Sequence, residues 1–129
     1  MAVATNAGFV ELAKRATGAA SDAWTYMALG TGTGQDASDT TLATENTASN
    51  GLQRASATVS TVTTTVTGDT AQWVKTFTST ATVTITEAGI FNQSSGGDML
   101  VVGDLSPTAP MVSTDTLTLT IKCQFKAAS

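Results

Sequence analysis

The chain has 129 residues, of which 12% are charged, with a formal net charge of −4 and no histidine. This length allows one domain. The lack of histidine excludes the commonest general base, the commonest metal ligand and every Ser–His or Cys–His nucleophile pair.

Other classes of protein are disfavoured on similar grounds. The six cations are scattered, which is a poor footprint for nucleic acid. The sequence contains no run of about 18 apolar residues, so no membrane-spanning helix is predicted. The N-terminus does not have the pattern of a signal peptide. The single cysteine, Cys123, cannot form an internal disulfide, which fits synthesis in a reducing cytoplasm.

The N-terminal 18 residues differ from the rest of the chain. Apolar residues recur at helical spacing from Phe9 onward, Thr5 or Asn6 can cap the start, and Gly18 can end the helix. We predict a short helix at about 6–16. Because so short a helix is marginal alone, it must dock on its own domain or on a neighbouring subunit.

Extended segments follow. A first strand is predicted at 24–29, and the polar stretch at about 30–50 is a long loop of the kind that is functional or mobile. The segment 52–66 alternates with a slip of phase, which indicates a bulge or a break into two strands. Residues 70–78 alternate again, with Trp73 and Phe77 toward the core.

The second half continues this pattern. A strand at 81–86 is interrupted near Gly89, which indicates a bulge or a close backbone contact. Another strand begins at Met99, and Pro107 and Pro110 bracket a predicted loop before the last strand.

The last strand has the clearest alternation in the chain. Its apolar positions are Leu117, Leu119, Ile121, Cys123 and Phe125, with polar residues between them. We predict a central strand in which Cys123 is a buried structural thiol. In total, six to eight short strands are expected from the turn spacing, which favours a mainly β fold, an antiparallel β-sandwich or a small barrel. The predicted organisation is an N-terminal arm or helix at 1–18 and a single β-sandwich domain at 19–129.

No residue set predicts catalysis. Most acids lie in predicted turns, where carboxylates bond the local backbone. Asp36, Asp39 and Glu45 share one loop, but their spacing does not match a calcium-binding loop. The glycines at 30–34 lack the context of a phosphate-binding loop, so a mobile turn is favoured.

Glu87 is the one acid in an apolar segment. It can pair with Arg or Lys at a subunit interface, or it can be a strand-end charge in water. Because exposed charges contribute little, the second interpretation is favoured.

Several short motifs occur in a familiar order. This order resembles a family of small tailed-phage structural proteins, labelled capsid cement (decoration) proteins or tail-fibre-like proteins. The matching segments are TNAGF at 5–9, YMALGTGT at 26–33, DTTLATE at 39–45, RA at 54–55, TEAGIFN at 86–92, GGDML at 96–100 and DTLTLT at 115–120.

The resemblance implies a jelly-roll-like β-sandwich, often trimeric, on the outside of an assembled shell. The first hypothesis is a non-enzymatic capsid decoration protein on the outer capsid surface, with the major capsid protein as partner and no cofactor, metal, nucleic acid, membrane or small-molecule substrate. The alternative is a small tail or tail-fibre-associated subunit, and the third is a carbohydrate-binding β-sandwich using Trp24 and Tyr26. The segments 1–18 and 30–50 are the expected contact regions, and the interface candidates are Phe9, Leu12, Arg15, Arg54 and Glu87.

Overall fold

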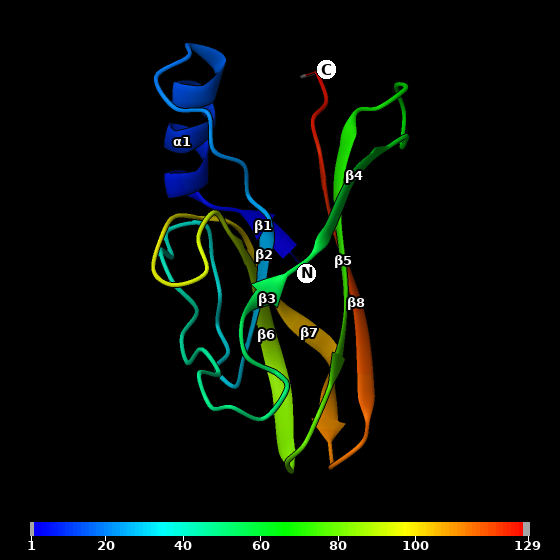
Figure 1. Cartoon of the computed structure of the whole chain (residues 1–129). Helices are drawn as coiled ribbons and strands as arrows, with labels where there is room; N and C mark the ends of the chain where they lie inside the picture. The colour runs from blue at the N-terminus through cyan, green and yellow to red at the C-terminus, as the bar shows by residue number, and fades with distance from the viewer. Residues whose placement is uncertain (1, 128–129) are drawn as a thin grey trace.

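Two antiparallel sheets make up the fold in the computed structural model, which describes residues 2–127 (Figure 1). The five-stranded sheet has the order β1-β7-β6-β2-β3, and the three-stranded sheet has the order β4-β5-β8. The elements are β1 (Ala2–Ala4), α1 (Asn6–Ala16), β2 (Tyr26–Gly30), β3 (Ala55–Ser56), β4 (Thr58–Val62), β5 (Thr70–Thr78), β6 (Val83–Phe91), β7 (Met99–Met111) and β8 (Thr116–Gln124). The mainly β, sandwich-like fold predicted from the alternation is therefore confirmed.

The main core lies between the sheets. Trp73 and Phe77 point inward from β5, as predicted, and are each 2% exposed. They belong to one apolar cluster with Met27, Leu29 and Ile85 of the larger sheet. Each such side chain stabilises the folded state by about 1.5–3 kcal/mol when it is buried, which makes this cluster the main source of stability.

The larger sheet is also covered on its outer face. A second cluster joins Ala28, Phe91, Met99 and Val102 to Leu42, which comes from the long loop after β2. Both faces of β2 and of the second half of β6 are buried, and these stretches are mostly apolar with little alternation, whereas the first half of β6 alternates Val83 and Ile85 with threonines.

The predicted helix is confirmed as α1. Thr5 is its N-cap, and the Thr5 hydroxyl accepts a hydrogen bond from the backbone N–H of Gly8 at 2.9 Å. The preceding strand β1, which the alternation did not predict, pairs with β7 at Val101, Val102 and Gly103. The N-terminal segment is thus hydrogen-bonded into the larger sheet.

The break into two strands predicted within 52–66 is confirmed, whereas the interruption of a strand predicted near Gly89 is wrong. The segment 52–66 does break into two strands, which lie in different sheets: β3 pairs with β2, and β4 pairs with β5. Strand β6 runs through Gly89 without interruption, and its register shifts lie between Ile85 and Glu87 and between Ile90 and Phe91. Gly89 is a site of close contact, since a Cβ there would lie 2.9 Å from the sulfur of Met99.

The loop predicted around the two prolines is wrong. Pro107 and Pro110 both lie inside β7, and the Ser106–Pro107 peptide is cis. Beyond Gly103, β7 pairs only with β6, because β1 is three residues long. A proline is tolerated there since its missing N–H can face the unpaired side.

The position predicted for the last strand is also wrong. Strand β8 is an edge strand of the smaller sheet, and β5 is the central one. Phe125 follows the end of β8 and is 49% exposed, so it does not join the buried face. Alternation shows that one face is buried, but it carries no information about how many neighbours a strand has.

Candidate interaction surfaces

Helix α1 docks on its own sheet through its smallest residue. A Cβ on Gly8 would lie 2.9 Å from the Cα of Leu100 in β7, so the helix approaches the strand at backbone distance. The Thr5 hydroxyl donates to the carbonyl of Met99, and Leu12 packs against the main core. The helix therefore packs within its own chain, one of the two arrangements left open by the sequence.

The opposite side of the helix presents apolar side chains. Phe9 is 55% exposed and Val10 is 58% exposed. Helix α1 lies at the same end of the molecule as the turn between β4 and β5 (Figure 1). Val66, in that turn, is also mostly exposed. Phe9 and Val10 are adjacent on α1, and adjacent exposed apolar side chains are typical of surfaces that contact another protein.

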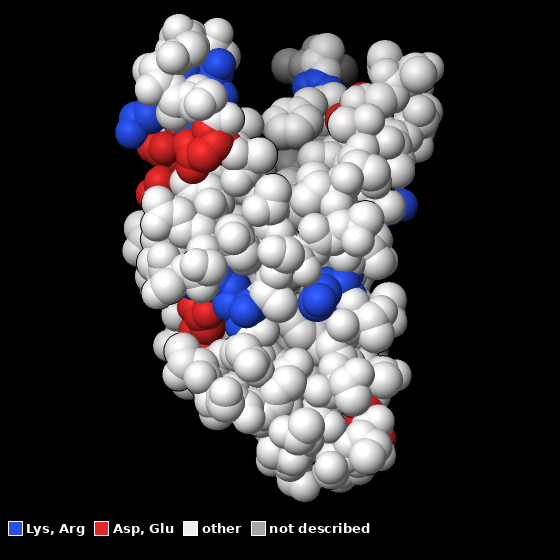
Figure 2. Space-filling model, in the orientation of Figure 1, with Lys and Arg blue, Asp and Glu red and all other residues white. Residues whose placement is uncertain are grey.

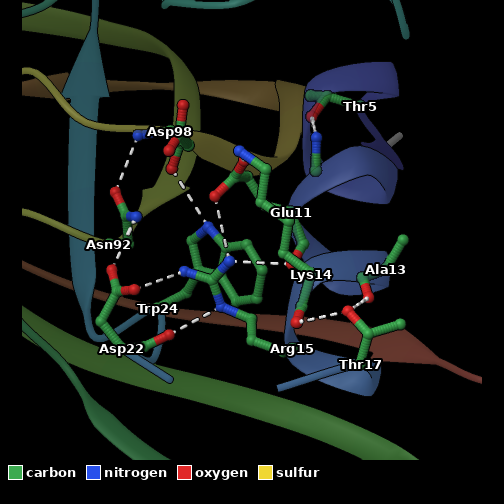
Figure 3. Close-up of polar contacts among 11 residues, drawn as sticks. Thr5, Glu11, Ala13, Lys14, Arg15, Thr17, Asp22, Trp24, Asn92 and Asp98 are labelled. Atoms are coloured by element: carbon green, nitrogen blue, oxygen red, sulfur yellow. Dashed lines mark hydrogen bonds and ion pairs between the residues drawn. The ribbon is translucent and has the colours of Figure 1, made fainter. Parts of the chain in front are cut away.

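Arg15 is held by its own chain. Its Nε donates to the carbonyl of Asp22 at 2.7 Å, and its Nη2 lies 2.8 Å from Oδ1 of Asp22. Its Nη1 donates to Oε1 of Glu11 at 3.1 Å, and the guanidinium lies 4.2 Å from the ring centroid of Trp24 (Figure 3). Hydrogen bonds from Lys14 and Arg15 lower the pKa of Glu11. This network anchors the segment after the helix.

The same network extends from Trp24 and Asp22 into the larger sheet. The indole Nε1 of Trp24 donates to the carbonyl of Asp98 at 3.1 Å, and Asn92 donates to Oδ2 of Asp22 at 2.9 Å (Figure 3). Trp24 is 6% exposed, so its ring is not available as a stacking surface for a sugar.

Glu87 is inside the protein. It is fully buried, which makes the predicted strand-end charge in water wrong. Its Oε2 accepts from the backbone N–H groups of Gly32 and Thr44, both at 2.8 Å, and its Oε1 accepts from the N–H of Ala43 at 2.9 Å. The side-chain amide of Gln35 also donates to Oε1. One carboxylate thus joins the first residues of the long loop to residues 43 and 44 farther along it, and these contacts satisfy its need for hydrogen bonds after burial.

Arg54 ties three segments together. Its Nε and Nη2 donate to the two oxygens of Glu45 at 3.0 and 2.7 Å, in a bidentate pair. Its Nη1 donates to the carbonyls of Gln93 and Gly96 at 2.9 and 2.7 Å, and the guanidinium lies 3.7 Å from the ring centroid of Phe91. The loop after β2, the segment before β3 and the turn after β6 are thereby joined.

The five interface candidates therefore divide into two groups. Phe9 is open to a partner, and Leu12 packs partly in the core. Arg15, Arg54 and Glu87 use their charged groups on their own chain. The burial of Glu87 has a signal in the sequence, since Glu87 lies between Ile85 and Ala88. Most of its partners are backbone N–H groups, which no residue pattern identifies.

The outer face of the smaller sheet is almost uncharged. Strands β4, β5 and β8 place mainly Thr, Ser and Gln on this face, with Lys122 as the charged residue on β8. Thr76 and Thr118 share a hydrogen bond between their hydroxyls across two strands, at 2.8 Å. In the view of Figure 2, charged side chains gather in a few small groups and most of the surface is uncharged.

Asp36 and Asp39 serve a local turn. The backbone N–H of Ser38 donates to Oδ1 of Asp36 at 2.8 Å, and the N–H of Asp36 donates to Oδ2 of Asp39 at 2.7 Å. Hydrogen bonds from Ser38 lower the pKa of Asp36. Within residues 2–127, no group of three or more His, Cys, Asp or Glu side chains could hold a metal ion.

Cys123 is partly buried on the inner face of β8. Burial raises the pKa of its thiol, which keeps it in the less reactive protonated form. No helix within the described part of the chain is long and apolar enough to cross a membrane.

Comparison with known proteins gives one match. A family model described as Podophage GP4 fiber I protein gp80 matches residues 2–123, which is nearly the whole chain. A search of curated proteins gave no match. A search of solved structures gave no match either.

Proposed function

This chain belongs to the Podophage GP4 fiber I protein gp80 family of phage structural proteins, and from this premise we propose that it is a non-enzymatic subunit of a phage fibre apparatus. The observation that carries the proposal is the family match over residues 2–123, which spans both sheets and helix α1. In this role the chain is a rigid module that acts through the surface it presents to other proteins. Homo-oligomerisation, with a trimer favoured by the resemblance to decoration proteins, is part of the proposal.

The internal polar networks support a rigid module. Glu87 and Arg54 hold the long loop against the larger sheet, and Arg15 holds the segment after the helix. Buried and bidentate charged hydrogen bonds fix geometry as well as adding stability. A module with fixed loops loses little conformational entropy when it joins an assembly, and this favours tight association.

The exposed side of helix α1 is the proposed contact with the rest of the particle. Phe9 and Val10 are both more than half exposed while the helix is anchored from behind by Thr5 and Gly8. Because about half of each side chain is already covered, burial of the exposed remainder in an interface stabilises it by about 2–3 kcal/mol before the cost of association.

A capsid decoration protein is the second candidate. The low charge of the smaller sheet supports it, because few ions would need to be desolvated against a shell. Its partner would be the major capsid protein on the outer capsid surface. Binding to the assembled shell, and not to its separated parts, would then stabilise the shell by mass action.

Copy number and location separate the two candidates. Quantitative mass spectrometry of purified particles, together with gold-labelled antibody, should place the protein at the tail in low proportion to the major capsid protein. Labelling spread over the head, in proportion to the major capsid protein, would replace the fibre proposal by the decoration proposal. Absence from purified particles would contradict both.

The helix contact has its own test. The double variant Phe9→Ser and Val10→Ser should fold normally and yet be incorporated into particles at least tenfold less. Val112→Ser is the matched control, since Val112 is 52% exposed and follows β7 at the opposite end of the molecule from α1 (Figure 1). Equal incorporation of the double variant and the control would exclude this contact.

A further inference from the structure

Strand β8 has a free edge along its whole length. All nine of its residues pair with β5 on one side, and no described strand pairs with it on the other. Half of its backbone N–H and C=O groups therefore face outward. A long row of such groups is a template for another strand, and proteins protect edges that must stay unpaired.

The other edges of the two sheets are short or blocked. Strands β1, β3 and β4 have three, two and five residues, against nine in β8. Strand β7 continues beyond the end of β1, but Pro107 and Pro110 interrupt its donors there. Strand β8 contains neither proline nor glycine, and Lys122 is its single charged residue. This contrast marks β8 as the edge that is left open to pairing.

A groove runs beside this edge. It has a volume of about 300 Å³ and lies between β8 and β7, with Leu119 and Ile121 on one side and Val101 and Leu105 on the other. Leu117, Leu119 and Cys123 on the inner face of β8 are only partly buried. The sandwich is therefore open along β8, and apolar side chains from an added strand would close it.

We propose that β8 pairs antiparallel with β8 of a second copy of this chain, about a two-fold axis at Thr120. In this register Leu119 lies opposite Ile121 and Leu117 opposite Cys123 on the groove side. On the outer face, Lys122 lies opposite Thr118, so the two lysines do not meet. The pairing uses all nine residues of each strand and makes one sheet from two three-stranded sheets.

Charge and geometry both favour a second copy in this register. Although the whole chain carries a net charge of −4, β8 contains no acid, so two copies can approach along it without repulsion between acids at the contact. A ring of copies would instead have to pair β8 with β4. Both strands run antiparallel to β5, so that contact would be parallel, and β4 has only five residues. The two-fold contact is longer and has the more stable antiparallel pattern. It either makes a dimer or links trimers in pairs, and it does not depend on where the protein sits in the virion.

A cysteine cross-link tests the register. In a Cys123→Ala background, Thr120→Cys places two thiols directly opposite each other at the axis, where Cβ atoms are about 4.5–5.5 Å apart, close enough for a disulfide after a small adjustment. Mild oxidation of the purified full-length chain should convert most of this variant to a covalent dimer. Thr58→Cys in the same background is the control, because Thr58 is exposed on the same face at the opposite edge of the sheet. Equal cross-linking of the two variants would overturn the proposal.

A charge substitution tests the same contact without a covalent cross-link. Thr120→Lys sets two lysines face to face at the axis and should weaken self-association by about tenfold or more, while Thr58→Lys should leave it unchanged. Sedimentation equilibrium measures the dissociation constant, and circular dichroism confirms folding. A wild-type chain that stays monomeric, or a Thr120→Lys variant that associates as wild type does, would contradict the proposal. If the wild type is monomeric and Thr120→Lys blocks incorporation into particles, another virion protein occupies this edge and the second-copy proposal is wrong.

Discussion

The backbone N–H of Gly32 donates to Oε2 of Glu87 at 2.8 Å, which joins residues 55 positions apart in the chain. Thr86, the neighbour of Glu87, donates from its hydroxyl to the carbonyl of Gly32 at 2.6 Å. The long loop is therefore bound to β6 through both a backbone N–H group and a backbone carbonyl of Gly32. These contacts hold a long polar segment against the larger sheet.

Glu87→Gln should loosen this loop. The substitution replaces one acceptor oxygen with an N–H donor that faces backbone donors, in a site with no exposure. We expect the free energy of unfolding to fall by about 2–3 kcal/mol. Hydrogen exchange should also show faster exchange at Ala43 and Thr44. The control is Glu11→Gln on α1, a partly buried acid that accepts hydrogen bonds from Lys14 and Arg15 and does not contact the loop; it should leave exchange at these two amides unchanged. Unchanged exchange at these two amides would show that the carboxylate does not hold the loop.

Gly51→Ala and Gly34→Ala form a matched pair. Both glycines have positive φ, at +83° and +82°, so the backbone strain of alanine is the same. A Cβ on Gly51 would overlap the carbonyl oxygen of Thr78, whereas Gly34 has open space around it. We expect Gly34→Ala to cost about 1 kcal/mol and Gly51→Ala about 3 kcal/mol or more. Urea unfolding measures both, and equal losses would contradict the packing at Gly51.

Asp69 should make stability depend on acid pH. Hydrogen bonds from the backbone N–H groups of Val66 and Thr64 hold the pKa of Asp69 well below its ordinary value of 3.8. Because the folded-state pKa is depressed, the stabilisation is present above pH 3.8 and is lost as the pH falls below it toward the folded-state value.

Asp69→Asn tests this dependence. The variant should be less stable than wild type at neutral pH, and the difference should shrink as the pH falls below about 4. Urea unfolding of both proteins at neutral pH and at a series of acid pH values gives the difference. A constant difference across the series would mean that the carboxylate charge does not contribute.

Arg54→Lys should weaken the junction of the three segments. Lysine keeps the charge but cannot make the bidentate pair with Glu45, donate to the carbonyls of Gln93 and Gly96 and lie flat on Phe91 at the same time. We expect a loss of about 1–3 kcal/mol in the free energy of unfolding. Lys122→Arg, on the exposed edge strand, should stay within about 0.5 kcal/mol of wild type. A stable Arg54→Lys variant would show that charge alone is sufficient at this position.

The local elements were predictable from the sequence, because their signals lie between near neighbours. The capped helix over residues 6–16, the alternating strand around Trp73 and Phe77, and the break within 52–66 all rest on spacings of two to four residues. Several open polar turns were predictable for the same reason. The β-sandwich class then followed from the number and length of the strands.

The candidate interaction surfaces could not be predicted, because they depend on contacts between segments that no local sequence pattern indicates. The partners of Glu87 and of Arg54 come from segments far apart in sequence, and most of them are backbone atoms. The same limit applies to Pro107 and Pro110, which lie in a strand only because β1 leaves the outer edge of β7 unpaired.

By itself, the sequence determined that this protein is a β-scaffold with one short helix and with no histidine-based chemistry. Only the tertiary structure decided that the last strand is an edge, that Glu87 is buried and that Phe9 faces outward. The physical reason is that alternation and helical spacing are properties of one segment, whereas edges, buried partners and exposed faces are properties of how segments pack against each other.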